Sequence, residues 1–156
     1  MFINNIKFAK NLQSQSGKVE LAKLARVQEL DSYGGTLEFK LMGYLDSLNR
    51  PTLSLKLYGT IDASCQNCLQ PMQVILDNES KLTIFYTEDQ LDSALFGEHD
   101  SGVEDAVLAD EEFDIMQLVE DEVIMLLPCA AKHESCIGLS YQDQVATPFN
   151  VLKELI

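Results

Sequence analysis

Two motifs in this chain have the residue types and the spacing of metal half-sites. Cys65 and Cys68 are separated by two residues, and His133 and Cys136 repeat that spacing further along the chain. Two thiolates on a tight turn can bind one side of a tetrahedral Zn²⁺, which usually takes four nitrogen or sulfur ligands. The set Cys65, Cys68, His133 and Cys136 therefore predicts a site for one zinc ion, with Cys129 as a spare thiol. The gap between the halves far exceeds that of a compact zinc finger, so only the fold could bring them together.

The same residues allow other chemistry. A CxxC motif can be a dithiol redox pair, but such a pair is expected before a helix, and here a strand-like segment follows. His133 and Cys136 permit a cysteine–histidine nucleophile, although no third orienting group is evident. The cysteines can also be buried hydrophobic side chains, which suits Cys129, or a site that holds no metal. A thiol–disulfide or zinc-dependent enzyme that uses the CxxC motif and His133 is therefore the alternative function.

Other candidates for catalysis are weak, so no catalytic residue and no small-molecule substrate are predicted. Gly34-Gly35 indicates a turn rather than a glycine-rich phosphate loop. His99 lies in an acidic segment, where a solvated side chain is expected. Glu122 is the exception among the acids, because apolar positions flank it in a helical pattern, so we expect a half-buried carboxylate that needs a partner.

The net charge of −14 is a local property of the chain. Residues 82–131 hold fourteen acids and no Lys or Arg, and the other eleven acids balance all eleven bases. Nonspecific nucleic-acid binding and attachment to anionic membranes both depend on basic patches, and the sequence has no basic run. A basic protein partner is permitted, because opposite charges steer association. An acidic surface that only keeps the protein in solution is the simpler interpretation.

The pattern of apolar and polar residues along the chain predicts that the candidate ligands are positioned by an α+β fold. Residues 1–16 are polar and mixed, which suggests an extended arm, and residues 17–30 suggest a short amphipathic helix, with a strand over 24–30 as the alternative. Strict alternation over 36–42 and 52–61 predicts a hairpin with a longer loop. Residues 73–76 and 81–86 suggest a second strand pair, with Asp77-Asn78 at the turn. Residues 17–86 are therefore expected to be mainly β.

The second half of the chain is expected to be a loop followed by helices. Residues 87–112 are acidic, with little periodicity, and suggest a flexible linker. Asp114 can cap a helix over 115–127 that Pro128 ends and that packs on the antiparallel sheet. Residues 148–155 suggest a short amphipathic tail, so 113–156 forms a helical C-terminal part. The chain as a whole, 1–156, has the length of a single domain.

Targeting signals are not evident in the sequence. The N-terminus lacks a basic region followed by an apolar run, and the longest apolar stretch is far short of the about 20 residues that a membrane helix needs. We therefore expect a cytoplasmic protein that does not bind membranes. In a reducing compartment, cysteines are more often ligands, catalysts or core residues than disulfides.

Several of these segments together resemble the YceD family, the large ribosomal RNA subunit accumulation proteins of bacteria and plastids. The segments that carry the resemblance are Cys65–Cys68, Leu118–Pro128, His133–Cys136 and Pro148–Leu152. They follow the order and spacing of the family pattern: a CxxC motif, an acidic linker, an acidic helix that ends in Leu-Pro, a His/Cys segment and a final Pro-Phe motif.

The resemblance implies a role in the synthesis or accumulation of large-subunit ribosomal RNA, and the family has no established catalytic reaction. It also implies that Cys65, Cys68, His133 and Cys136 are the candidate zinc ligands, and that Glu122, Pro128, Pro148 and Phe149 are motif positions. The leading hypothesis is a non-enzymatic factor that binds a large-subunit precursor or a basic ribosomal protein through its acidic segment, 87–122. Direct RNA contact stays open, since the fold could gather scattered lysines on one face.

Overall fold

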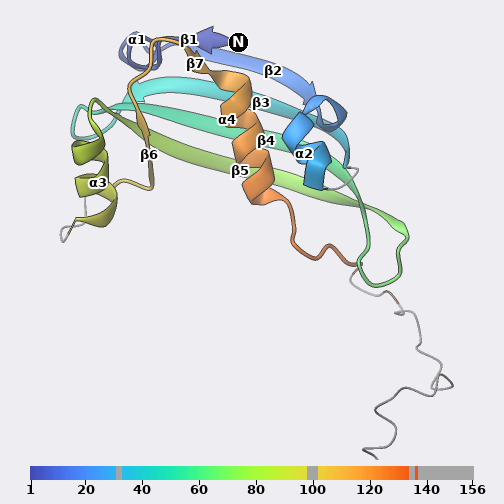
Figure 1. Ribbon diagram of the computed structural model, residues 1–156. Helices are drawn as coiled ribbons and strands as arrows, with labels where there is room; N and C mark the ends of the chain where they lie inside the picture. The colour runs from blue at the N-terminus through green and yellow to red at the C-terminus, as the bar shows by residue number, and fades with distance from the viewer. Residues whose placement is uncertain (31–32, 98–101, 134–135, 137–156) are drawn as a thin grey trace, which may run out of the picture.

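The computed structural model describes residues 1–30, 33–97, 102–133 and 136. Within these ranges the chain forms a mixed α+β structure (Figure 1). In chain order the elements are β1 (Phe2–Ile3), α1 (Asn5–Lys10), β2 (Ser14–Glu20), the 3₁₀ turn η1 (Leu21–Lys23), α2 (Ala25–Leu30), β3 (Gly34–Leu45), β4 (Pro51–Ser64), β5 (Pro71–Phe85), α3 (Glu88–Phe96), β6 (Asp105–Leu108), β7 (Phe113–Asp114) and α4 (Ile115–Leu126).

A five-stranded sheet with the order β2-β3-β4-β5-β6 forms the body of the molecule. Its first four strands are antiparallel, and β6 joins β5 in parallel. Along β3, residues 37, 39 and 41 are buried while 36, 38 and 40 are exposed, which is the alternation of a strand with one covered face. The hairpin expected from 36–42 and 52–61 is confirmed, and both of its strands are longer than the alternation indicated.

The second expected strand pair is wrong, because 73–76 and 81–86 belong to the single strand β5. Its pairing with β4 continues without a break from Ser64 opposite Pro71 to Thr52 opposite Thr83. Asp77 and Asn78 lie in the middle of this strand, and the Asn78 side chain donates to Ser80 Oγ instead of forming a turn. The long, continuous pairing with β4 overrides the local turn preference of Asp-Asn.

Helix α4 lies diagonally across one face of the sheet (Figure 1). It begins as expected, with the Asp114 carboxylate accepting a bond from the Met116 amide, and its last residue is Leu126. Ile115, Val119 and Val123 recur at helical spacing on its buried side, and they belong to the same hydrophobic core as the inward leucines of the sheet. The expected packing of this helix on the sheet is confirmed.

The first 30 residues differ from the expected arm and helix. Residues 1–16 contain β1, α1 and the start of β2, so the extended arm is wrong. Asn4 caps α1, and Phe8 packs into the core where Gly43 of β3 lets the helix backbone come close, because a Cβ there would lie 2.5 Å from the Phe8 carbonyl oxygen. Helical structure within 17–30 is confined to η1 and α2, and a strand over 24–30 is not formed.

The acidic segment 87–112 is not a continuous loop. It contains α3, capped by Thr87 and ended at Gly97, and the short strand β6. Residues 98–101 of the segment and the expected amphipathic tail at 148–155 lie outside the described residues. In the part of the chain that is described, no helix is long and apolar enough to cross a membrane.

Candidate metal centre

The turn between β4 and β5 holds the first pair of candidate ligands. Cys65 follows directly on the last residue of β4, and Cys68 lies three residues before β5 begins. The turn is closed by two backbone hydrogen bonds, from the Cys65 amide to the Gln70 carbonyl and from the Leu69 amide to the Cys65 carbonyl, both of 2.9 Å. Leu69 has a φ of 59°, the left-handed conformation that lets so short a turn close. This turn directs both sulfur atoms to one side.

The chain that follows α4 brings the second pair to the first. After Pro128 it runs back to the β4–β5 turn, where the Gln66 amide donates to the Ala131 carbonyl at 2.8 Å. Ala131 is buried at this contact, so the two segments are packed as well as hydrogen-bonded. His133 and Cys136 follow at once. The fold therefore joins the half-sites that the sequence leaves far apart.

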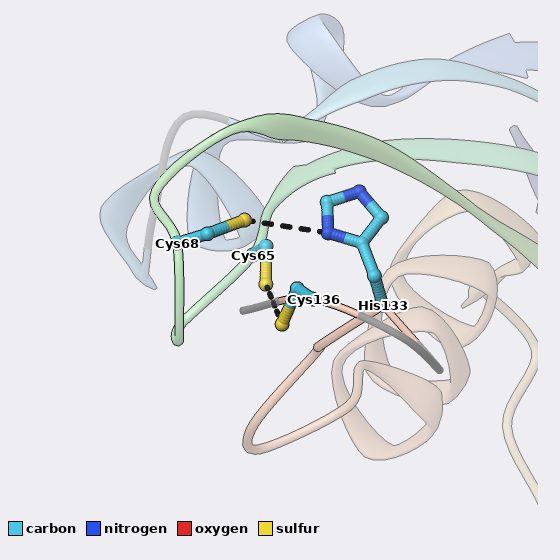
Figure 2. Close-up of side chains that lie close together, drawn as sticks. All are labelled: Cys65, Cys68, His133 and Cys136. Carbon is cyan, nitrogen blue, oxygen red and sulfur yellow. Dashed lines mark hydrogen bonds between the residues drawn. The ribbon is translucent and has the colours of Figure 1, made fainter. Parts of the chain in front are cut away.

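The four side chains converge on one point, as Figure 2 shows. Their ligand atoms all lie within 4.8 Å of one another. Cys65 Sγ is 3.7 Å from Cys136 Sγ, and Cys68 Sγ is 3.4 Å from His133 Nδ1. In a tetrahedral site with Zn–S bonds of about 2.3 Å, neighbouring sulfurs are about 3.8 Å apart, and a sulfur–nitrogen edge is slightly shorter. The three thiols and the imidazole therefore fit one zinc ion in donor type, number and spacing.

Hydrogen-bond donors surround the sulfur atoms. The backbone amide of Asn67 donates to Cys65 Sγ at 3.4 Å, and its side-chain amide donates to Cys136 Sγ at 2.9 Å. Such bonds stabilise thiolates and orient them toward a cation. Asn67 is the residue of the candidate site that the sequence did not reveal, because a position between the two cysteines of a CxxC motif carries no signal of its own.

The electrostatics of the turn favour a thiolate at Cys65. Burial raises the pKa of this thiol, but the amides of Cys68, Asn67 and His133 outweigh burial and lower the pKa to about 5. For Cys68 the Gln70 amide lowers the pKa, whereas burial and the nearby sulfurs of Cys65 and Cys136 raise it, and the net shift is upward. One thiolate is thus stabilised by the protein alone, and a second negative charge beside it needs a cation.

Comparison with known protein families gives one match. The family model described as "Large ribosomal RNA subunit accumulation protein YceD" matches residues 53–155, which is most of the chain. The protein belongs to the YceD family. No curated protein and no solved structure matches it. The matched region begins in β4 and includes every candidate ligand, so the candidate metal centre of this YceD family member lies within the part of the chain that the family model matches.

The other residues that the sequence singled out lie outside the cluster of candidate ligands. Glu122 is 8% exposed on α4, and its carboxylate accepts a hydrogen bond of 2.6 Å from Ser80 Oγ, so the expected buried carboxylate has its partner. Pro128 follows the last turn of α4, as expected. Cys129 is exposed, so its interpretation as a core residue is wrong: it follows the end of α4 and no longer continues the buried side of that helix. His99, Pro148 and Phe149 lie outside the described residues.

Proposed function

We propose that this protein is a non-enzymatic cytoplasmic factor that promotes the synthesis, processing or accumulation of large-subunit ribosomal RNA and the assembly of the large subunit. It acts by binding a basic ribosomal protein or a pre-ribosomal particle. The family match over residues 53–155 is the observation that carries this proposal.

Ion pairs and hydrogen bonds within the fold support a smaller contact surface for the proposed basic partner than the whole acidic segment. Three acids of α4 are engaged within the fold: the Arg26 backbone amide donates to Glu120, the Arg26 guanidinium pairs with Asp121, and Ser80 donates to Glu122. The more exposed acids lie on α3, at the start of β6 and after it: Glu88, Asp89, Asp92, Asp105, Asp110, Glu111 and Glu112. Glu104 is exposed as well, but it pairs with Lys81. We therefore assign the partner surface to α3 and β6 rather than to the whole segment 87–122.

The metal centre has a structural role in this proposal. Cys65, Cys68, His133 and Cys136 would hold one zinc ion, which would link the β4–β5 turn to the chain that follows α4. All four positions are filled by protein donors, which is typical of a structural site, whereas catalytic zinc keeps one position open for water or substrate. The ion would stabilise the thiolates and fix the course of the chain beyond α4.

Sedimentation of tagged protein against ribosomal particles tests the function. We expect co-sedimentation with large-subunit precursors at low salt and a weaker association at moderate salt, where the exposed charges are screened. Pull-downs from the same extract should recover ribosomal proteins or precursor RNA. Recovery of neither above background at low salt contradicts the proposal.

Metal analysis combined with thiol titration separates the structural centre from the enzymatic alternative. One zinc per chain, with only Cys129 reacting rapidly, agrees with a structural site, because Cys129 is the exposed thiol and is not among the clustered ligands. A metal-free protein that forms a reversible disulfide within the CxxC motif favours the thiol–disulfide enzyme instead. Cys129→Ser is the matched control, because this substitution should remove the rapid thiol and leave the zinc content unchanged.

A further inference from the structure

The sheet face opposite α4 carries a row of lysines that the proposed function does not use. Helices α1, α2 and α4 pack on one face of the sheet, and the side chains of β2–β5 that point away from them are largely exposed. Each of these four strands contributes one lysine to the uncovered face: Lys18 from β2, Lys40 from β3, Lys56 from β4 and Lys81 from β5. We call these four residues the lysine stripe.

Strand register makes the stripe a continuous diagonal. Lys40 and Lys56 are direct cross-strand partners at its centre. Lys18 of β2 pairs with Glu38, the outward residue of β3 that comes two positions before Lys40. Lys81 of β5 pairs with Ser54, the residue of β4 that comes two positions before Lys56. The two offsets run in the same direction across the sheet, so the four lysines form a diagonal. With neighbouring strands about 4.8 Å apart, the stripe crosses about 14 Å of the sheet, which is enough for several consecutive phosphates of an extended chain.

The contacts of these lysines leave the centre of the stripe open to an anion. Lys18 pairs with Glu38 at 2.6 Å, Lys56 with Glu79 at 3.0 Å and Lys81 with Glu104 at 3.4 Å, all between exposed side chains. Exposed ion pairs of this kind contribute little to stability, so a phosphate can replace the carboxylate at little cost. Lys40 forms no ion pair with any of the described residues. It also faces Lys56, and like charges in direct cross-strand positions destabilise a sheet.

Hydroxyl groups and aromatic rings flank the lysines. A hollow of about 340 Å³ on one side of Lys40 is lined by Ser16, Lys56 and Tyr58, among others. A second hollow, of about 590 Å³, is lined on the other side by Ser14 and Tyr44, among others. Ser54 also borders it, but this side chain is buried and donates to Glu79. Tyr58 is 59% exposed beside Lys56, so its ring face is accessible to a planar group. Lysines for phosphate, hydroxyls for sugars and an exposed ring for a base are the components of single-strand binding on an open sheet.

We propose that the lysine stripe binds single-stranded RNA, with Lys40 at the central phosphate contact and Tyr58 stacking on a base. The choice of RNA as the polyanion rests on the proposed function. Because the stripe is short and shares its face with acids, binding is weak and independent of sequence. It depends on salt, since the contacts are between lysines and phosphates. The acidic surface on α3 and β6 and the lysine stripe would then contact the protein and the RNA of one particle.

Fluorescence anisotropy of a labelled oligouridylate, titrated with the full-length protein at several salt concentrations, tests this proposal. Lys40→Gln should weaken binding about three- to tenfold and reduce the slope of log K against log salt by about 0.7, the value for one phosphate contact on a single strand. Tyr58→Ala should weaken binding about fivefold or more, with the slope unchanged. Lys7→Gln is the matched control, because Lys7 is an exposed cation on α1, on the covered face.

Two further results would overturn the proposal: unchanged binding in Lys40→Gln, or equal losses in Lys40→Gln and Lys7→Gln. Binding of wild-type protein to phosphatidylserine vesicles but not to the oligouridylate would overturn it as well. Urea denaturation excludes unfolding as the cause, because Lys40→Gln removes a like-charge pair and should raise the unfolding midpoint. The proposed function is tested separately. If a variant that no longer binds RNA still associates with ribosomal particles, the proposed function stands and RNA binding is not required for it. If the protein binds RNA but does not associate with particles, only the proposed function is refuted.

Discussion

Glu122 shows how one side chain can connect the main helix to the sheet. Its carboxylate is 8% exposed and accepts from Ser80 Oγ, which in turn accepts from the Asn78 side chain on the same strand. The three groups form a hydrogen-bonded chain from β5 to α4. A buried carboxylate is tolerated here because a short hydrogen bond offsets part of its lost hydration.

Substitution of Glu122 should therefore reduce stability in a graded way. We expect Glu122→Ala to lower the free energy of unfolding by about 1–3 kcal/mol, because it leaves Ser80 without its acceptor inside the fold. Glu122→Gln keeps an acceptor oxygen and should cost less. Urea denaturation measures both, and Glu112→Gln, at an exposed position, is the control. Equal effects of the Ala and Gln variants would show that the hydrogen bond does not contribute.

At the scale of single residues, the candidate ligands could be predicted from the sequence, but the groups that surround them could not. Cys65, Cys68, His133 and Cys136 stand out because thiols and imidazoles at short, repeated spacings are rare outside metal and redox sites. Asn67 did not stand out, since an amide side chain suits any turn and its bonds to two sulfurs depend on a contact between distant segments. Exposure of Cys129 was also missed, because it depends on where α4 ends and the chain turns back.

At the scale of elements, Asp114 determines where α4 begins and ties it to the N-terminus. Its carboxylate accepts from the Met116 amide and lies 3.0 Å from the Met1 ammonium. The ammonium lowers the pKa of this carboxyl, burial opposes that shift, and the Met116 and Gln117 amides add to the lowering. A lowered folded-state pKa means that the stabilisation is present above the unfolded value of about 3.9 and is lost as the pH falls through the folded value.

Two variants of Asp114 separate the cap from the charge. Asp114→Ala removes both and should cost about 1 kcal/mol near neutral pH, a typical value for an N-cap. Asp114→Asn keeps a capping oxygen but loses the ion pair, so it should cost less at neutral pH. The difference in stability between wild type and Asp114→Asn should vanish as the pH falls below the folded pKa of Asp114. Urea denaturation at a series of pH values measures this, and a difference that persists in acid would contradict the assignment.

Metal removal tests the link between the β4–β5 turn and the chain after α4. Chelation, or Cys68→Ser, should speed amide exchange in residues 65–70, because the Gln66 amide is protected only by its bond to the Ala131 carbonyl. The β3–β4 pair should keep its protection, since its core contacts do not involve the centre. Hydrogen-exchange mass spectrometry, with Cys129→Ser as the control, measures both regions. Faster exchange throughout the sheet would mean that the metal supports the whole fold instead.

Helices and strands with a strong periodicity of apolar residues could be predicted from the sequence. Those that are stabilised by packing or pairing with distant parts of the chain could not. The hairpin of β3 and β4 and the helix after Asp114 follow from alternation, helical spacing and a cap. Helix α1 has only six residues, too few for a periodic signal, and it is stabilised by the packing of Phe8 over Gly43. Strand β5 was divided at Asp77-Asn78 because a turn preference is local, whereas the pairing that overrides it extends over the length of β4.

At the scale of the whole molecule, the charged side chains form an acidic surface and the lysine stripe, which the net charge of −14 does not reveal. Acids on α3 and beside β6 lie toward one end of the strand order, and the lysine stripe crosses the uncovered face from β2 to β5. The two surfaces meet where Glu104 pairs with Lys81. A strongly acidic protein can therefore present cations locally. In the proposed function, this arrangement would let a basic protein and an RNA strand contact the molecule at once through largely different residues.

The acidic surface can be tested by neutralising part of it on α3. Glu88→Gln with Asp92→Asn removes two exposed carboxylates and should reduce the recovery of ribosomal proteins in low-salt pull-downs by about threefold or more, because the loss of steering charges slows association. Glu20→Gln with Glu29→Gln is the charge-matched control, since it changes the net charge equally on β2 and α2. If both double variants lose recovery to the same extent, total charge rather than this surface determines binding. At moderate salt the wild type and the α3 variant should converge, because screening removes the contribution that the substitutions delete.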